Sequence, residues 1–226
     1  MLEAVIFDFD GVVVDSEPIH RDCFRRVVRP YGVTFTDEEY YARYLAYSDR
    51  DAFLRMVNGH DLDEEAIDID ALIDRKTALV QEALATTVTP LPGAIELMAA
   101  IREAGLALAI CSAALRREVE LPLERAGAAA LVQVIVAAED VHVHKPDPTG
   151  YIETRRRLGE AIGRDLAADR CVAIEDSPGG IAAAKAAGMA VLAVTNTLDA
   201  EHLARADRVV DALASVTVDD LRRLTP

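Results

Sequence analysis

The sequence predicts an α/β protein with a doubly wound parallel sheet and an inserted bundle of helices. Short apolar runs alternate with helical segments from about residue 90 onward, whereas residues 16–87 are helical in character. Such alternation is typical of a parallel sheet with helices on both faces. A chain of 226 residues can bury a full hydrophobic core and can hold one or two domains. We therefore expect residues 1–15 and 88–226 to form an α/β core domain and residues 16–87 to form a helical domain.

The first strand is expected over residues 2–10, because residues 4–7 are an unbroken apolar run, typical of a strand buried on both faces. A helix is expected over residues 16–30, which carry a proline near each end. Further helices of the inserted domain are expected over residues 37–46, 49–58 and 64–85. In the core, helices are expected over residues 94–104, 113–127 (interrupted at Pro122), 148–158 and 178–188. Strands are expected over residues 106–111, 132–137, 171–174, 190–194 and 208–210, with a helix after each of the last two.

Two aspartates follow the first apolar run. Asp8 and Asp10 are separated by one residue, and Gly11, which allows the backbone to turn sharply, comes next. Side chains alternate along a strand, so both carboxylates project to the same side if the chain stays extended. Two like charges close together are costly unless a cation or a shared proton offsets them. The pair is therefore either solvated at the end of a strand or part of a site for a divalent cation.

Polar residues also follow the later strands. In a doubly wound sheet, ligands bind beyond the carboxyl ends of the strands. Taken along the chain, the residues at these positions are Ser112, Lys145, Glu175 and Asp176. Each alone has an ordinary structural explanation, such as helix capping or solvation. Because each lies at a strand end, together they indicate one site.

The charges of this set indicate its chemistry. Asp8 and Asp176 supply the hard oxygen ligands that Mg²⁺ prefers, and the sequence shows no His/Cys cluster that would favour zinc. A carboxylate can attack phosphorus to form an aspartyl-phosphate, while a second carboxyl protonates the leaving oxygen and later activates water. Ser112 and Lys145 can hold the phosphoryl oxygens as charge shifts.

These residues resemble the motifs of the haloacid dehalogenase superfamily over nearly the whole chain. The stretch from Asp8 to Ser16 is similar to the first motif of the phosphatases and phosphomutases in that superfamily. The second, third and fourth motifs are matched by Ser112, by Lys145, and by Glu175 with Asp176. The resemblance implies a Rossmann-like core, an inserted helical cap that closes over the substrate, and Mg²⁺ as cofactor. Dehalogenases of the superfamily lack the second aspartate, so Asp10 argues against dehalogenation.

The resemblance also implies a role for each residue. Asp8 would be the nucleophile and Asp10 the general acid and base. The metal would be held by Asp8, by the backbone carbonyl of Asp10 and by Asp176, with Glu175 holding a metal-bound water. The catalytic residues Ser112 and Lys145 would hold the phosphoryl oxygens, and Ser112 and Ala113 would bind the substrate.

Within the superfamily, the chain is similar to the group that contains β-phosphoglucomutase, phosphoglycolate phosphatase-like proteins and small sugar phosphatases. Residues 15–20, 48–51 and 75–76 resemble cap motifs of that group. By this resemblance His20 lies at the hinge, while Arg50 and Lys76 reach the substrate. The alternative is that His20 is a packed hinge residue and that Arg50 and Lys76 are solvated helix residues.

Two departures from the group favour hydrolysis over a mutase reaction. Ala114 and Leu115 follow the second motif, where members of the group carry polar residues for a second phosphate. The loop over residues 46–48 also lacks a glycine that is common in relatives. We therefore expect a Mg²⁺-dependent phosphatase acting on a small phosphorylated metabolite, a sugar phosphate. The alternatives are a sugar-phosphate mutase and a non-catalytic module that binds metal or phosphate.

Composition limits the partners. The formal net charge of −15 and the pI near 4.7 disfavour nucleic acid and anionic membranes, which are both polyanions. Apolar runs are shorter than the roughly 20 residues that span a bilayer, and we expect no signal peptide because a basic leader is lacking. The three widely spaced cysteines are expected to be reduced thiols. We expect a cytoplasmic protein that is a monomer or a weak oligomer.

Overall fold

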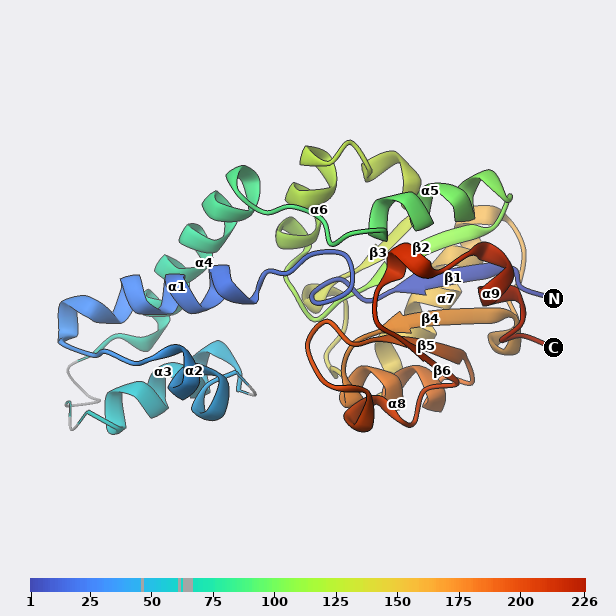
Figure 1. Cartoon of the computed structure of the whole chain (residues 1–226). Helices are drawn as coiled ribbons and strands as arrows, with labels where there is room; N and C mark the ends of the chain where they lie inside the picture. The colour runs from blue at the N-terminus through green and yellow to red at the C-terminus, as the bar shows by residue number, and fades with distance from the viewer. Residues whose placement is uncertain (46, 61, 63–66) are drawn as a thin grey trace. The chain divides into compact units, whose positions relative to one another are not determined.

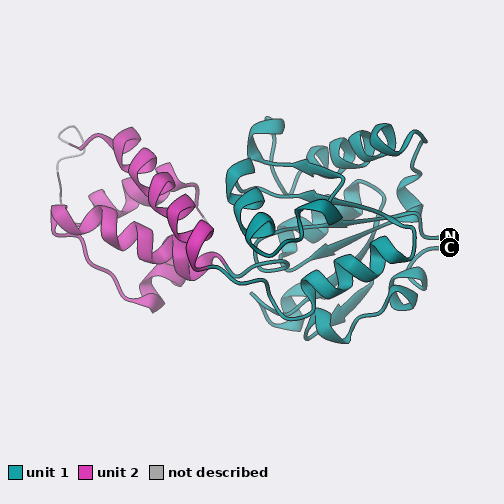
Figure 2. Ribbon diagram, turned by 90° about the horizontal axis from the view of Figure 1, so that it is seen from above, with its two compact units in different colours: residues 1–15, 88–226 teal, residues 16–87 magenta. Residues whose placement is uncertain are grey.

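The computed structural model describes residues 1–45, 47–60, 62 and 67–226. The chain divides into two compact units, which Figure 2 draws in separate colours. Unit 1 comprises Met1–Asp15 and Val88–Pro226, and unit 2 comprises Ser16–Thr87. Each unit has its own cluster of buried apolar side chains. The chain therefore leaves unit 1 once, builds unit 2, and returns.

Unit 1 is built on a six-stranded sheet in the order β3-β2-β1-β4-β5-β6. All neighbouring strands are parallel, which confirms the predicted fold class. β1 lies in the middle of the sheet, between β2 and β4, so the strand order reverses beside it. The strands are β1 (Ala4–Phe7), β2 (Ala107–Cys111), β3 (Val134–Val136), β4 (Cys171–Glu175), β5 (Ala190–Val194) and β6 (Arg208–Val210).

Helices cover both faces of this sheet (Figure 1). On one face α7 (Thr149–Ile162) and α8 (Pro178–Ala186) pack on each other and on the strands. On the other face α5 (Ala94–Glu103) packs on β2 and on α9 (Val218–Arg222). All residues of β1, β2 and β4 are buried, as expected for the central strands of a parallel sheet. The sheet thus holds its strand ends in fixed positions.

The first strand is shorter than the predicted range of residues 2–10. After β1 the N–H of Val13 donates to the carbonyl oxygen of Phe9 at 2.7 Å. Gly11 adopts φ of +72°, which residues with a Cβ atom rarely adopt, so the chain turns there. Asp10 lies in this turn and pairs with Val14 in an isolated bridge. The prediction of one extended stretch through Asp10 is therefore wrong, because local hydrogen bonds fold residues 9–14 back on themselves.

The two crossings between the units are joined within unit 1. Val14, just before the chain leaves, pairs in an antiparallel bridge with Pro90, just after it returns. Beside them the N–H of Leu91 donates to the carbonyl oxygen of Val13 at 2.8 Å. The exit and the re-entry of the chain therefore lie side by side.

Several predicted helix limits differ from the structure. α6 (Arg116–Arg125) continues through Pro122, because a proline there removes only the bond to the carbonyl of residue 118. α7 ends at Ile162, four residues beyond the predicted end at residue 158. The chain after β5 forms the short 3₁₀ helix Ala200–Leu203 in place of an α-helix.

Unit 2 is a small helical bundle. Its elements are α1 (Glu17–Val28), the 3₁₀ turn Arg29–Tyr31, α2 (Asp37–Arg43), α3 (Asp49–Asn58) and α4 (Ile69–Thr86). The part of the predicted helix 64–85 before residue 67 and the end of the predicted helix 37–46 at residue 46 lie outside the described residues. Aromatic rings hold the bundle together: Phe24 lies 4.9 Å from Phe53 and 6.0 Å from Tyr40 between ring centroids.

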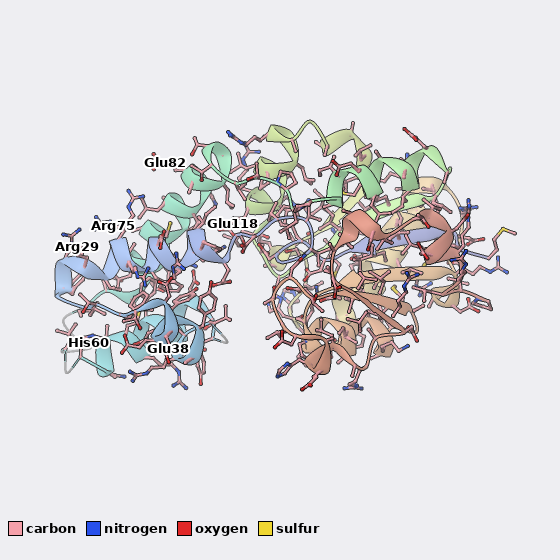
Figure 3. The ribbon with its side chains drawn as sticks, in the orientation of Figure 1. Arg29, Glu38, His60, Arg75, Glu82 and Glu118 are labelled. Carbon is pink, nitrogen blue, oxygen red and sulfur yellow. The ribbon has the colours of Figure 1, made fainter. Side chains whose placement is uncertain are left out.

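The surface of unit 2 carries charged side chains and the exposed rings of Tyr31, Tyr41 and Tyr47. Figure 3 labels four exposed charged side chains that project from the outside of the bundle: Arg29, Glu38, Arg75 and Glu82. Among the described residues of the whole chain, no helix combines the length and the apolar character that crossing a membrane requires.

Candidate active site

Five of the predicted site residues meet at the carboxyl edge of the sheet in unit 1. Because β1 and β4 pair in parallel, the N–H of Asp8 donates to the carbonyl oxygen of Ile174 at 2.9 Å. This register places Asp8 beside the end of β4. The residues that β1, β2, β3 and β4 or their following loops carry to this edge are Asp8, Ser112, Lys145, Glu175 and Asp176. The edge adjoins the point where the strand order reverses, which is where doubly wound sheets bind ligands.

Lys145 links two of the carboxylates. Its Nζ lies 2.8 Å from Oδ1 of Asp8 and 2.7 Å from Oε1 of Glu175. Burial lowers the pKa of Lys145, but the two carboxylates together outweigh burial and raise that pKa above its usual value. Lys145 is therefore a fixed positive charge, and its ammonium lies in contact with Asp8.

Three buried carboxylates share this space. Asp8, Glu175 and Asp176 each offer an oxygen, and these oxygens lie within 4.8 Å of one another. We call these three residues the acidic cluster. Burial, and next the charge of Glu175, raise the pKa of Asp8 well above its usual range. Burial also raises the pKa of Asp176 to about 6, although a hydrogen bond from Thr197 opposes the shift. The single ammonium of Lys145 thus leaves the cluster short of positive charge.

This donor set fits a hard divalent cation. Closely spaced carboxylate oxygens are ligands that Mg²⁺ takes in proteins, and a cation would offset the burial and the repulsion that raise the two pKa values. Asp8 and Asp176 have the oxygens for direct ligation. The acidic cluster is therefore suited to a divalent metal.

Glu175 is held by more partners than the sequence indicated. Besides Lys145, its Oε1 accepts a hydrogen bond from the hydroxyl of Tyr151 at 2.8 Å, and its Oε2 accepts one from the hydroxyl of Ser177 at 3.1 Å. The carboxylate packs against Gly180, where a Cβ atom would lie within 1.8–2.1 Å of it. Glu175 is fully buried, so these contacts fix its side chain. Tyr151 and Gly180 carried no signal in the sequence, since both lie within helices of ordinary composition.

The sequence interpretation also missed two residues after β5. The hydroxyl of Thr197 donates to Oδ2 of Asp176. The side-chain amide of Asn196 donates to the carbonyl oxygen of Gly11 at 2.8 Å. Both lie at the carboxyl edge of the fifth strand, so the strand-end argument extended to that strand would have found them.

Asp10 stands beside the cluster, in the turn that Gly11 allows. It is partly exposed, whereas Asp8 is buried. The charge of Asp10 adds to the raised pKa of Asp176, after burial and the charge of Glu175. Asp10 is therefore close to the cluster but more accessible than its members.

Ser112 and Ala113 lie on a small crevice that Lys145 also lines. Ser112 is buried, and its backbone N–H donates to the carbonyl oxygen of Val136 at 2.9 Å. Its hydroxyl oxygen accepts a hydrogen bond from the N–H of Ala114 at 2.9 Å, and Ala113 is exposed. The N–H groups of Ser112 and Ala114 are thus engaged, whereas the hydroxyl of Ser112 and the N–H of Ala113 can donate to an anion in the crevice that Lys145 also lines.

The two arginines after this turn are engaged elsewhere. The guanidinium of Arg116 donates to the carbonyl oxygen of Ile135 at 3.1 Å and to Asp140 at 2.5 Å. Arg117 donates to Glu124 at 2.9 Å. Neither guanidinium is therefore free to replace the polar residues that Ala114 and Leu115 lack.

The remaining predicted residues lie in unit 2. Nζ of Lys76 is buried, 3.0 Å from Nδ1 of His20 and 2.6 Å from Oδ1 of Asp49, and it lies 4.4 Å from the centroid of the Phe24 ring. Burial, together with the charge of Lys76, lowers the pKa of His20 to about 3. Arg50 is exposed and forms an ion pair with Asp70. The structure thus brings His20 and Lys76 together, and it does not bring Arg50 to them.

Comparison with known proteins agrees with this architecture. The family model described as haloacid dehalogenase-like hydrolase matches residues 5–194. Validoxylamine A 7'-phosphate phosphatase of Streptomyces hygroscopicus subsp. limoneus is 31% identical over 222 residues, which cover 96% of each protein. A putative β-phosphoglucomutase from Thermotoga maritima has a similar structure, with a TM-score of 0.79, 25% identity, and coverage of 99% of this chain and 100% of the other. A variant of CbbY from Rhodobacter sphaeroides in complex with xylulose-(1,5)bisphosphate has a TM-score of 0.83, 27% identity and full coverage of both chains.

Proposed function

The chain belongs to the haloacid dehalogenase-like hydrolase family and is an enzyme of the phosphatase type. We propose that it depends on Mg²⁺ and that it hydrolyses a small phosphate monoester, namely a sugar phosphate. One observation carries the proposal: Lys145 lies 2.8 Å from Asp8 within a buried cluster of carboxylates. A negatively charged carboxylate can approach a negatively charged phosphate only where fixed positive charge reduces their repulsion. The named activity of the validoxylamine phosphate phosphatase and the sugar bisphosphate in the CbbY complex support the substrate class.

We propose that Asp8 is the nucleophile. Its carboxylate oxygen attacks phosphorus, the bond from phosphorus to the ester oxygen breaks, and the alcohol leaves with a proton from Asp10. The product of this step is a phosphoryl group on the Asp8 carboxylate. Asp10 then removes a proton from water, and the resulting hydroxide attacks phosphorus to release inorganic phosphate and regenerate Asp8.

Other residues of the edge hold the transferred group in this proposal. Lys145 neutralises the charge on Asp8 and the phosphoryl oxygens, and the hydroxyl of Ser112 and the N–H of Ala113 donate to those oxygens. Asp8, Asp176 and the backbone carbonyl of Asp10 would hold Mg²⁺, with Glu175 holding a water on it. When bound, Mg²⁺ supplies positive charge between the nucleophile and the phosphate.

We assign unit 2 the part of a cap that selects the substrate. His20, Arg50 and Lys76 are its candidate substrate residues. Lys76 is paired with Asp49 and His20, so any contact with a phosphate or sugar requires that it exchange Asp49 for the ligand. The three cysteines are buried and unbridged, which supports the proposal of a cytoplasmic enzyme.

Hydrolysis is favoured over the mutase reaction. The similarity to a putative β-phosphoglucomutase keeps the mutase as the second candidate. A mutase must also bind a second phosphate. The cations next to Ala114 and Leu115 are Arg116 and Arg117, which are bound to Asp140 and Glu124 respectively and so are engaged elsewhere.

The test is a phosphate-release screen with Mg²⁺ over sugar phosphates, phosphoglycolate and nucleotides, with p-nitrophenyl phosphate as a generic substrate. Asp8→Asn is expected to lower kcat by about 10³-fold or more, because the amide cannot act as the nucleophile. Asp169→Asn, the same change at an exposed position before β4, serves as the matched control. Mass spectrometry of acid-quenched wild-type protein checks for a phosphoryl group on the peptide that contains Asp8.

Retained turnover in Asp8→Asn would refute the assignment of the nucleophile. Conversion of a hexose 1-phosphate that depends on a bisphosphate activator, with little release of inorganic phosphate, would establish the mutase. No turnover of any substrate in the screen would favour the non-catalytic module.

A further inference from the structure

The loop after β5 contacts two parts of the candidate site that are far from it in the sequence. Thr197 donates its hydroxyl to Oδ2 of Asp176, which ends β4, and Asn196 donates to the carbonyl oxygen of Gly11, which follows β1. The resemblance to the family's motifs assigned no residue of this loop. The fifth strand therefore contributes to the same edge as the other four.

The contact between this loop and the site is tightly packed. A Cβ atom on Gly11 would lie 1.9 Å from Oδ2 of Asp176 and 2.5 Å from the hydroxyl oxygen of Thr197. Gly11, Asp176 and Thr197 thus meet with no space for a further heavy atom. Oδ2 of Asp176 therefore lies close to Gly11 and also accepts the hydrogen bond from Thr197, in the loop after β5.

We propose that Thr197 is a positioning residue for Asp176: its hydroxyl holds one carboxylate oxygen, so that the carboxylate stays oriented to ligate a divalent cation within the acidic cluster. A hydroxyl that donates to a metal-binding carboxylate fixes its orientation, as partners of metal ligands commonly do. The inference rests on the proposed Mg²⁺-dependent phosphatase, but it concerns a different residue and a different measurement.

Three variants separate the hydroxyl of Thr197 from its bulk. Thr197→Val keeps the branched shape and removes the donor, whereas Thr197→Ser keeps the donor and removes the methyl group. Thr195→Val is the matched control, because it replaces threonine by valine two residues before Thr197. Within the described part of the chain, the Thr195 hydroxyl makes no hydrogen bond to the acidic cluster. Thr197 is exposed, so its replacement leaves the hydrophobic core intact.

Mg²⁺ binding is measured first without substrate, by isothermal titration calorimetry on the full chain. Thr197→Val is expected to weaken Mg²⁺ binding about 10-fold, a typical effect of losing a partner of a metal ligand. Thr197→Ser is expected to recover most of the affinity, and Thr195→Val is expected to match the wild type. In the phosphatase assay, the Mg²⁺ concentration for half-maximal rate should rise by the same factor in Thr197→Val, while the KM for substrate at saturating Mg²⁺ stays unchanged.

Wild-type affinity for Mg²⁺ in Thr197→Val overturns the inference. Equal losses in Thr197→Val and Thr197→Ser also overturn it, because the variant that keeps the hydroxyl would then bind Mg²⁺ no better than the variant that lacks it. The wild-type protein tests the proposed function separately: if it neither binds Mg²⁺ nor releases phosphate, the proposed function fails. If the wild type does both and Thr197→Val binds Mg²⁺ equally well, only the role of Thr197 is wrong.

Discussion

The two units each bury a lysine beside an aspartate, but the charges around these lysines differ. In unit 1, Lys145 contacts Asp8 and Glu175, two of the three buried carboxylates of the acidic cluster. In unit 2, Lys76 forms an ion pair with Asp49, whose side chain is 34% exposed, and lies beside His20, which is neutral because its pKa is lowered to about 3. The cluster of unit 1 therefore has more carboxylates than ammonium groups and needs a cation, whereas in the described part of unit 2 the ammonium of Lys76 is matched by the carboxylate of Asp49. Such an imbalance, rather than burial alone, distinguishes a candidate catalytic centre from a structural ion pair.

The largest expected effect comes from removing the lysine of the unbalanced cluster. Lys145→Met is expected to lower kcat about 10²–10³-fold, because it removes the positive charge that contacts Asp8, the proposed nucleophile. Steady-state phosphate release with Mg²⁺ measures this effect. Lys185→Met, which removes the same charge from a half-exposed pair with Asp207, is the matched control and should retain the wild-type rate. A kcat near the wild-type value in Lys145→Met would show that the cluster around Lys145 is not the catalytic centre.

A smaller effect is expected on the pH dependence of stability. The pKa of Asp176 is raised from 3.8 to about 6, so the folded protein binds a proton that the unfolded chain releases at lower pH. In this window the folded state holds more protons than the unfolded state, so the stability of the metal-free protein falls as pH rises. The expected loss from this group between about pH 4 and pH 7 is about 3 kcal/mol.

Mg²⁺ should cancel that loss, since a bound cation favours the ionised carboxylate. Urea unfolding at several pH values, with Mg²⁺ and with a chelator, measures both free-energy curves. We expect the stabilisation by Mg²⁺ to grow with pH and to reach about 2.7 kcal/mol at a concentration 100-fold above Kd. A stabilisation by Mg²⁺ that does not vary with pH would contradict the assignment of the excess charge to the acidic cluster.

The smallest effect is expected in the balanced cluster. Lys76→Met is expected to lower the free energy of unfolding by about 1–2 kcal/mol, because bonds to His20 and Asp49 are lost while Asp49 remains partly solvated. Urea unfolding measures the change, and it should be the same with and without Mg²⁺. If Mg²⁺ rescues the stability of this variant, the separation between the two clusters is wrong.

The sequence predicted the parts of the site that local patterns mark. Apolar runs end at Asp8, Ser112 and Glu175, and parallel pairing brings strand ends to one edge, so strand order was enough to collect these residues. The turn at Asp10 was harder to foresee, because it depends on backbone bonds to Phe9 rather than on apolar character.

Contacts between distant segments could not be predicted. Tyr151 reads as an ordinary helix residue, and only packing of α7 beneath the sheet brings its hydroxyl to Glu175. The burial of the Lys76 side chain likewise depends on contacts with Asp49 and His20, which lie on two other helices. Spacing along the chain contains none of this information, since each contact joins residues more than 20 positions apart.

The bridge between Val14 and Pro90 has a consequence for how the inserted unit can change in evolution. The points where the chain leaves and re-enters unit 1 are hydrogen-bonded neighbours. The insertion of residues 16–87 therefore joins two adjacent positions of unit 1, as a short surface loop would. The entropy of closing a loop grows only slowly with its length, so exchanging this segment for a longer, shorter or unrelated one costs the core little. If unit 2 is the proposed cap, evolution can therefore exchange it to change the substrate while the acidic cluster of unit 1 is retained.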